Sequence, residues 1–443
     1  MSSIRIPEIS YKNKIRTLLI ICLIILINFI GSAQNINKTR CSISKQEALL
    51  KKKNPYRSSE IQEFKKLIDN WVKNEYDSAS RSSITIPVVV HLLYNTESQN
   101  ITDQQILSQI KALNQDFSRT NPDTADTPKD FLSVAGNSNI QFCLVTKDPS
   151  GNKTNGIIRK KTSKTAFTDE DDAIKFTAKG GDDSWPTTQY FNIWVCDLGD
   201  DILGYGEFPT SMATNTYGLV VNYRSFGTLG KVLAPYDKGR TSTHEVGHCL
   251  NLYHIWGDEP DCDQDDEIDD TPLQKSENKG CPVYPQKADS GGSCEAAGPS
   301  SMYMNYMDYT NDECMNMFSK QQVSRMLAVL NVKPYNALKS SNKCGGINSI
   351  DDFTDAITTQ KNVSFKLYPN PGKGELNISF NSKTSCNITV TIFDIIGNKL
   401  SSDSYKNLEN NSKLRLPNLT TGVYFFEIDC DGKKQIERII INN

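Results

Sequence analysis

Residues 244–254 read HEVGHCLNLYH and hold three of the four histidines in the chain. On a helix, His244 and His248 lie four residues apart and therefore on one face, within reach of one metal ion. Glu245 follows the first histidine, where its carboxylate can take a proton from water on that ion. Three neutral imidazoles suit Zn²⁺, and three protein ligands leave a fourth position open. The stretch therefore predicts a catalytic rather than a structural zinc site.

His254 reaches the same ion only if the helix ends and the chain reverses near Asn251. Asn sometimes replaces Gly in the left-handed conformation of such a turn, at a cost of about 1 kcal/mol. Two alternatives stay open at this stage. The third ligand could be a downstream carboxylate, Glu259 or Glu267, or the histidines and Glu245 could lie on a surface helix that binds no metal.

Composition limits the class of protein. The 443 residues suggest about three units at roughly 150 residues each. Lys and Arg number 49 against 52 Asp and Glu, a formal net charge of −3. No global basic field is available to hold nucleic acid by counterion release, so we expect no nucleic-acid partner.

The amino terminus has the pattern of a secretory signal. Basic residues precede a mostly apolar run from Thr17 to Ile30, and Gly31-Ser32-Ala33 offers a cleavage site. The run is shorter than the ~20 residues of a membrane-spanning helix. We expect cleavage after Ala33 and no stable membrane span afterwards, with a retained anchor as the alternative. Twelve cysteines agree with export, because exported chains keep disulfides.

The character of the chain changes along its length. We predict five segments, namely a signal peptide (1–33), a polar, lysine-rich pro-segment (34–82), an α/β domain (83–340), a linker (341–362) and a small all-β sandwich (363–443). In the α/β domain, the β-branched strand Ile84–Val90 precedes an amphipathic helix at Asp103–Phe117. A loop-rich stretch follows the histidines from Gly257 to Tyr303. The last segment alternates short strands with turns, as sandwiches do.

A second landmark lies at residues 304–309, which read MNYMDY. Together with HEVGHCLNLYH it resembles the metzincin metalloproteases, and within them the pappalysin group that includes ulilysin and the bacterial cytophagalysins. The resemblance covers about residues 84–338. It implies a mixed twisted sheet with a zinc helix and a loop-rich lower subdomain. It also implies that Met307 forms the turn beneath the zinc histidines and that Tyr309 supports the tetrahedral intermediate.

The loop-rich stretch carries further expected features. Sequence alone allows three pairings of its four cysteines, and the resemblance implies Cys262–Cys294 and Cys281–Cys314. It also places Glu313 at the base of a pocket for an arginine side chain of the substrate, which would favour Arg or Lys by charge pairing.

Residues 261–270 hold seven carboxylates. Hard oxygen ligands at this density suit Ca²⁺, although a solvated acidic loop has the same composition. The resemblance points to Asp266 and Thr271 as part of a calcium site.

Lys38-Thr39-Arg40-Cys41 resembles the Arg-Cys phrase by which some pappalysin-like zymogens place a thiolate on the zinc. Cys41 would then fill the open position of the ion. An unpaired cysteine in a leader is the alternative. Activation would require cleavage near Ser78–Ser83, where Arg81 offers a basic site.

Residues 363–443 resemble the sorting domain that type IX secretion systems recognise. This implies the secretion machinery as a partner and export through the periplasm and outer membrane, with the protein either released or held at the cell surface. A carbohydrate-binding or adhesive sandwich is the alternative.

These observations predict a secreted zinc endopeptidase that acts on protein or peptide substrates. Glu245 would deprotonate the attacking water and then protonate the leaving amine. The pocket acid would favour Arg or Lys on the primed side of the cleaved bond. A non-catalytic, zinc-binding surface adhesin is the alternative, but such a scaffold has no need of Glu245.

Overall fold

The structure, a computed structural model, describes residues 39–79, 83–199, 202–258, 262–263, 265–286, 294, 300–339, 342–344, 365–373, 375–380, 388–394, 399–405, 412–414, 416–430 and 433–442. The chain divides into two compact units, residues 1–345 and 346–443. The predicted signal peptide (1–33), the region around Arg81 and most of the predicted linker (341–362) lie outside the described residues. Within the described part, no helix is both long and apolar enough to cross a bilayer.

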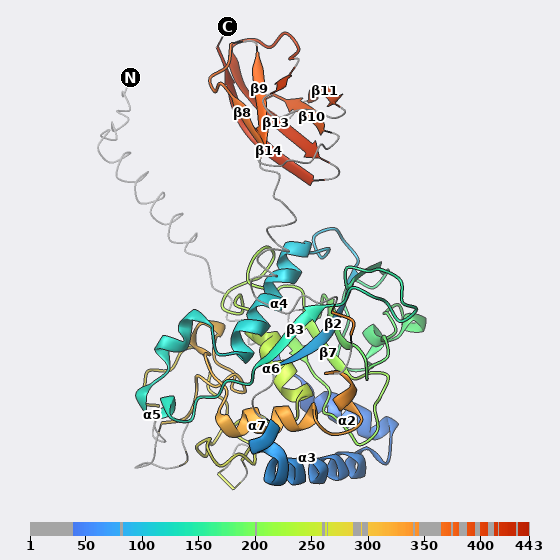
Figure 1. Cartoon of the computed structure of the whole chain (residues 1–443), viewed down its shortest axis with the longest axis vertical. Coiled ribbons are helices and arrows are strands. Elements are labelled where there is room, and N and C mark those ends of the chain that lie inside the picture. Colours follow the sequence, from blue (N-terminus) through green and yellow to red (C-terminus); the bar gives the residue numbers. More distant parts are fainter. Residues whose placement is uncertain are drawn as a thin grey trace, which may run out of the picture. The chain divides into compact units, whose positions relative to one another are not determined.

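The first unit is built on a seven-stranded mixed sheet (Figure 1) in the order β1-β6-β7-β5-β2-β3, with β4 also paired to β2. Only the pairing of β6 with β7 is antiparallel. The strands are β1 (Thr39–Cys41), β2 (Ile84–Tyr94), β3 (Ile140–Leu144), β4 (Ile157–Lys161), β5 (Phe191–Cys196), β6 (Ile202–Tyr205) and β7 (Gly218–Asn222). The central strands β5 and β7 are buried along their whole length, as expected for a largely parallel sheet covered on both faces.

The predicted helix at Asp103–Phe117 is confirmed as α4, which packs against β3 and α6. Its first turn is capped by the Thr102 hydroxyl, which accepts a hydrogen bond from the Gln105 N–H. The other helices of this unit are α2 (Ile43–Lys53), α3 (Arg57–Ala79), α5 (Lys129–Leu132), α6 (Arg240–Cys249) and α7 (Lys320–Val329). Short 3₁₀ turns lie at Pro122–Asp126, Ala173–Lys175, Thr177–Lys179, Asp312–Cys314 and Tyr335–Ala337.

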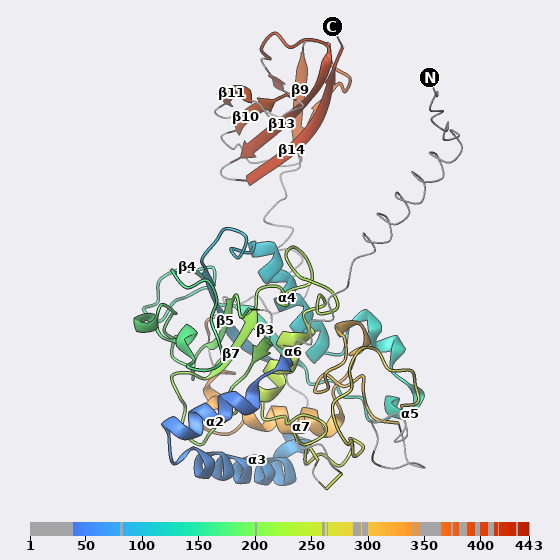
Figure 2. The ribbon, with the colours of Figure 1, turned by 180° about the vertical axis from the view of Figure 1, so that it is seen from behind.

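Residues 39–79, called here the N-terminal segment, fold onto the first unit. Strand β1 adds to the free edge of β6 in the parallel sense, with Cys41 opposite Gly204. Helices α2 and α3 follow, and both views of the chain place α3 alongside α7 (Figures 1 and 2). Phe64, Ile68 and Trp71 of α3 are buried.

Disulfides tie down the loops of the first unit. Cys262–Cys294 and Cys281–Cys314 are both formed, as the resemblance implied. A third bond, Cys143–Cys344, joins β3 to a residue near the end of the unit and was not predicted.

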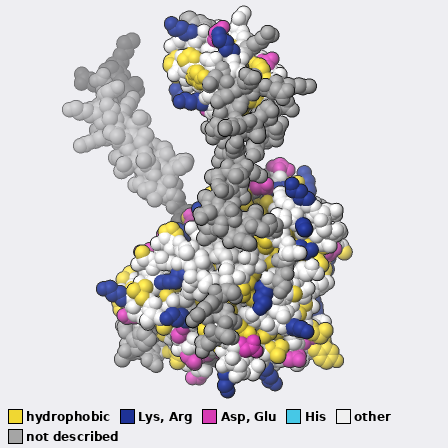
Figure 3. All heavy atoms as spheres, in the orientation of Figure 1, with side chains coloured by type: hydrophobic (Ala, Val, Ile, Leu, Met, Phe, Trp, Pro, Cys, Tyr) yellow, Lys and Arg dark blue, Asp and Glu magenta, His cyan; other side chains and the backbone are white. Residues whose placement is uncertain are grey.

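Lys and Arg are interspersed with Asp and Glu over the face seen in Figure 3.

The second unit is the predicted all-β sandwich. One antiparallel sheet has the order β11-β10-β13-β14 and the other the order β12-β9-β8. The strands are β8 (Phe365–Tyr368), β9 (Leu376–Phe380), β10 (Ile388–Phe393), β11 (Lys399–Tyr405), β12 (Ser412–Leu414), β13 (Gly422–Cys430) and β14 (Lys433–Ile441). Apolar side chains from both sheets, among them Ile378, Ile392 and Phe426, form one core.

Candidate active site

Helix α6 carries the first two histidines and is buried along its whole length. It begins after Gly239, whose φ of 76° is left-handed. A side chain at Gly239 would meet the Gln109 amide, which donates to the Gly239 carbonyl. Packing against β7 and α4 therefore fixes where the histidine face of α6 points.

The three histidines of HEVGHCLNLYH converge. The Nε2 atom of His248 lies 3.0 Å from Nε2 of His244 and 3.1 Å from Nε2 of His254. Tetrahedral nitrogen ligands at ~2.0–2.1 Å from one zinc ion are roughly 3.3 Å apart. The three residues are at most 1% exposed, so this donor set fits a single buried Zn²⁺.

The opposite ring nitrogens face acceptors. Nδ1 of His244 is 2.7 Å from the Tyr306 carbonyl, and Nδ1 of His248 is 2.8 Å from the Leu252 carbonyl. Such contacts hold the proton on Nδ1 and leave Nε2 free to bind metal. Burial, followed by the neighbouring imidazoles, lowers the pKa of His244 well below its usual value and that of His248 to about 3. Both rings are therefore neutral at physiological pH.

The chain reverses after α6 at Asn251, which has a left-handed φ of 68°. Its N–H donates to the His248 carbonyl over 2.9 Å, and the Leu252 N–H donates to the Gly247 carbonyl over 2.9 Å. The turn brings His254 onto the other two histidines. Glu267, an alternative third ligand, instead pairs with Lys65 at 3.1 Å, and Glu259 lies outside the described residues.

The Met-containing turn lies directly under α6. A Cβ added to Gly247 would come within 2.4 Å of the Met307 sulfur, so only glycine allows this approach. The Ile255 N–H, just past the third histidine, donates to the Met307 carbonyl. Met307 thus packs against α6 beside His248 and is hydrogen-bonded to the chain just after His254.

Glu245 and Tyr309 flank the histidines. Glu245 is fully buried, and burial raises its pKa to about 8. Strand β6 approaches it closely, since a Cβ at Gly204 would lie 3.2 Å from the Glu245 Cγ. The Tyr309 ring centroid is 4.9 Å from that of His254 and 5.7 Å from that of His244. Both side chains therefore border the position where the three Nε2 atoms meet.

Cys41 occupies this position from the side of the N-terminal segment. Its sulfur and the three histidine nitrogens all lie within 4.8 Å of one another. The thiol donates to Glu245 Oε2 over 3.3 Å, and the Cys41 carbonyl accepts a hydrogen bond of 3.1 Å from the Tyr309 hydroxyl. One residue thus contacts both groups that flank the histidines.

Arg40, the residue before Cys41, inserts into a buried acidic pocket. Its guanidinium donates to the Thr310 carbonyl over 2.7 Å and to Asp312 Oδ1 over 2.9 Å. The second oxygen of Asp312 accepts the N–H groups of Lys238 and Arg240 at 2.9 and 3.1 Å. The acid is therefore held in place from within the α/β domain.

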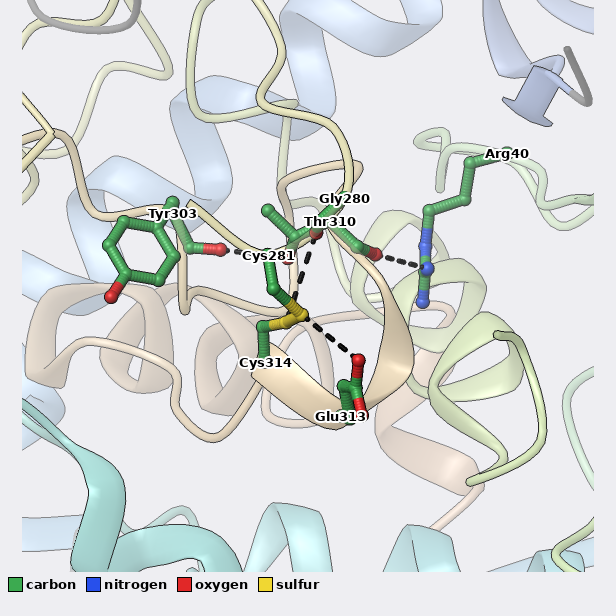
Figure 4. Close-up of a disulfide and its surroundings, with 7 residues drawn as sticks. All are labelled: Arg40, Gly280, Cys281, Tyr303, Thr310, Glu313 and Cys314. Atoms are coloured by element: carbon green, nitrogen blue, oxygen red, sulfur yellow. Dashed lines mark hydrogen bonds between the residues drawn. A yellow bond between two sulfur atoms is a disulfide. The ribbon is translucent and has the colours of Figure 1, made fainter. Parts of the chain in front are cut away.

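Glu313, the acid predicted at the base of this pocket, points elsewhere. It is exposed and lies 3.4 Å from the Cys281 sulfur. Figure 4 shows the Arg40 guanidinium reaching toward the Thr310 carbonyl, while the Glu313 carboxylate is directed at the Cys281–Cys314 disulfide. The side chain that binds arginine here is Asp312, one position earlier than predicted.

Two further acids were not singled out from the sequence. Asp258 contacts Nδ1 of His254 and orients the third ring. Asp308 is fully buried and accepts the N–H groups of Tyr309 and Asn278, each over 2.7 Å. Its position between Met307 and Tyr309 could have identified Asp308 from the sequence, because a buried acid there must be hydrogen-bonded.

The structure brings Asp266 and Thr271 together. The Thr271 hydroxyl donates to Asp266 Oδ1 over 2.7 Å, and burial raises the pKa of Asp266 to about 7. Oδ2 of Asp266 has no hydrogen-bond partner among the described residues. In that same part of the chain, no set of three His, Cys, Asp or Glu ligands includes Asp266.

Comparison with known proteins agrees with this geometry. Residues 177–331 match the family model described as pregnancy-associated plasma protein-A, and residues 366–442 match a secretion system C-terminal sorting domain. An extracellular metalloprotease of Arthroderma benhamiae is 31% identical over 271 residues, which are 60% of this chain and 78% of that protein. One from Arthroderma otae is 32% identical over 257 residues, 57% of this chain and 80% of that protein.

The chain is a pappalysin-family metalloprotease. Mature mirolysin of Tannerella forsythia in complex with a cleaved peptide is 48% identical, with a TM-score of 0.56 over 60% of this chain and 99% of that one. A promirolysin mutant from the same organism is 45% identical, with a TM-score of 0.61 over 68% and 97%. The metzincin fold of the first unit and the sorting domain identify a secreted pappalysin exported by a type IX system.

Proposed function

We propose that this pappalysin is a zinc-dependent endopeptidase made in a latent form. The observation that carries the proposal is the meeting of three buried Nε2 atoms beside Glu245. His244, His248 and His254 would hold Zn²⁺, which when bound polarises water and the carbonyl of the bond to be cut. The catalytic domain would be the predicted segment 83–340.

In this proposal Glu245 moves the protons. Its carboxylate takes a proton from the attacking water and delivers it to the leaving amine. The Tyr309 hydroxyl, once released from the Cys41 carbonyl, donates to the oxygen on which negative charge develops. Asp258 and Asp308 act as positioning residues, because Asp258 contacts Nδ1 of His254 and Asp308 accepts the backbone N–H of Tyr309.

The N-terminal segment would be the predicted pro-segment, 34–82, and Cys41 its latch. Three observations support this assignment: the sulfur lies among the histidines, the thiol engages Glu245 and the Cys41 carbonyl engages Tyr309. Peptide hydrolysis by the proposed mechanism needs the place among the histidines, Glu245 and the Tyr309 hydroxyl to be free of Cys41. Removal of the segment by cleavage near Ser78–Ser83 would therefore be required for activity.

The substrate would be a protein or peptide with Arg, or less well Lys, on the primed side of the cleaved bond. Arg40 supports this, because its planar guanidinium reaches both a carbonyl and a carboxylate in a pocket that Asp312 completes. Lys offers a single point charge and fits such a pair of acceptors less well. Asp312 therefore replaces Glu313 as the proposed specificity residue.

We also propose a structural Ca²⁺ in the acidic loop, with Asp266 and Thr271 among its ligands. Oδ2 of Asp266, which is buried and has no hydrogen-bond partner among the described residues, supports it, because an unsatisfied buried carboxylate oxygen is costly unless a cation or proton neutralises it. The Asp266→Asn variant would then lose the increase in melting temperature that Ca²⁺ gives the wild-type protein.

The test of the main proposal is hydrolysis of quenched peptides by the activated protein, with a zinc chelator and Glu245→Ala as controls. We expect the chelator to abolish cleavage, and Glu245→Ala to lower kcat by at least about 10²-fold while one zinc per chain stays bound. Zinc binding without any cleavage by the wild type would favour the adhesin alternative instead.

A further inference from the structure

A second set of acids lies beside the end of β6, away from the Asp312 pocket. Asp169, Asp172 and Glu207, called here the acidic flank, are buried and face the N-terminal segment. Because β1 runs parallel to β6, the chain after Cys41 continues toward Glu207 and Phe208. The Phe208 ring lies 5.5 Å from that of His248. Glu207 of the acidic flank is thus next in the chain to a residue whose ring contacts His248.

The N-terminal segment contacts the acidic flank with basic or donor groups. Arg57 lies 3.3 Å from Glu207 and donates to the Phe208 carbonyl over 3.3 Å. The Gln46 amide donates to Asp172 Oδ2 over 3.0 Å, and Lys45 is 3.6 Å from Asp169. Arg57 and Gln46 are at most 1% exposed. The segment itself therefore covers the flank oxygens that it contacts.

Removal of the N-terminal segment would leave the acidic flank with more carboxylates than cations. Lys175 is the cation nearest to it in the catalytic domain, 3.4 Å from Asp172 and 3.6 Å from Glu207. Two carboxylates then share one ammonium group. Oε2 of Glu207 and Nζ of Lys175 make no hydrogen bond in the described part of the chain, although the two atoms form an ion pair at 3.6 Å. The three carboxylates of the flank therefore outnumber the one ammonium group that pairs with two of them, and the site retains net negative charge.

We propose that the acidic flank is a second substrate-binding site in the active enzyme, and that it binds a basic side chain on the non-primed side of the cleaved bond. The inference rests on the proposed function, since it takes Arg40 to mark the primed side. Arg57 and Gln46 then occupy positions that a substrate guanidinium fills after activation. A charged donor at a desolvated carboxylate forms a stronger hydrogen bond than a neutral one.

The experiment uses the activated enzyme and quenched peptides that all carry Arg on the primed side. Each non-primed position in turn is Arg, Gln or Glu. We expect Arg at one of these positions to raise kcat/KM about fivefold to tenfold over Gln, and Glu to lower it. Glu207→Gln should remove the advantage of Arg, so that the ratio of kcat/KM for the Arg peptide to that for the Gln peptide falls to about one.

Glu170→Gln is the control, because this exposed acid lies in the chain between the flank residues Asp169 and Asp172 but does not belong to the flank. It should keep the preference for Arg. If Glu207→Gln loses turnover of all peptides, Asp172→Asn takes its place. Equal kcat/KM for Arg and Gln at every non-primed position of the wild type, with cleavage intact, overturns this inference alone. Absence of any chelator-sensitive cleavage overturns the proposed function instead.

Discussion

Two buried arginines, Arg40 and Arg57, attach the N-terminal segment to the catalytic domain in different ways. Arg40 binds Asp312, an acid that backbone N–H groups of the domain hold on its other side. Arg57 divides its donors between Glu47 of its own segment and Glu207 of the domain. The first pocket is complete without the segment, whereas the second is partly built by it. Equal burial therefore does not mean equal contribution to docking.

The largest effect should follow Arg40→Ala, which leaves Asp312 buried without its cation. Truncating one partner of a buried pair costs about 3–5 kcal/mol. Hydrogen exchange would measure this loss of docking free energy as faster exchange of residues 39–53. The Glu245→Ala background is used because, on the proposed mechanism, it cannot cleave itself. Unchanged protection of β1 would mean that Arg40 does not anchor the segment.

The Asp312 pocket can also be tested in the activated enzyme. Asp312→Asn should lower kcat/KM for primed-side Arg peptides by about 30-fold or more, since losing one partner of a buried charged pair costs about 2–5 kcal/mol. Peptides with Gln at that position should lose far less. Glu313→Gln is the control, and a larger loss from it than from Asp312→Asn would restore the prediction made from sequence.

A smaller effect should follow Arg57→Gln. Glu207 keeps Lys175 and the Thr214 hydroxyl, which donates to it over 2.8 Å, so its charge is not left alone. We expect a loss of about 1–2 kcal/mol in docking of the segment, read by the same exchange experiment at α2. Lys45→Gln is the matched control, because its 74% exposed side chain should contribute almost nothing. Equal effects of Arg57→Gln and Arg40→Ala would remove the distinction between the two anchors.

The strands, helices and residue spacings that could be predicted are those that a local pattern in the sequence determines. The β-branched run at Ile84–Val90 and the apolar face of α4 have periods that can be recognised without tertiary information. The spacing of His244, His248 and Glu245 is fixed by the helix itself. These features depend only on residues that are close together in the chain, so they can be recognised in the sequence.

The missed features depend on distant contacts. Strand β1 has three residues and exists only because β6 has a free edge. Asp312 and Glu313 are adjacent acids, and a 3₁₀ turn together with two backbone N–H groups decides which one faces Arg40. No spacing rule distinguishes such neighbours. Cys143–Cys344 likewise joins residues 201 positions apart.

That last bond has a mechanical consequence. Everything from residue 143 to residue 344 lies in one covalent ring, including the three histidines, Met307 and Asp312. The sorting domain follows this ring along the chain, so a pull by an export machine on the sorting domain passes from Cys344 through the disulfide to β3. The tension therefore does not pass through the segment that holds these residues, and only the chain on either side of the ring carries the load.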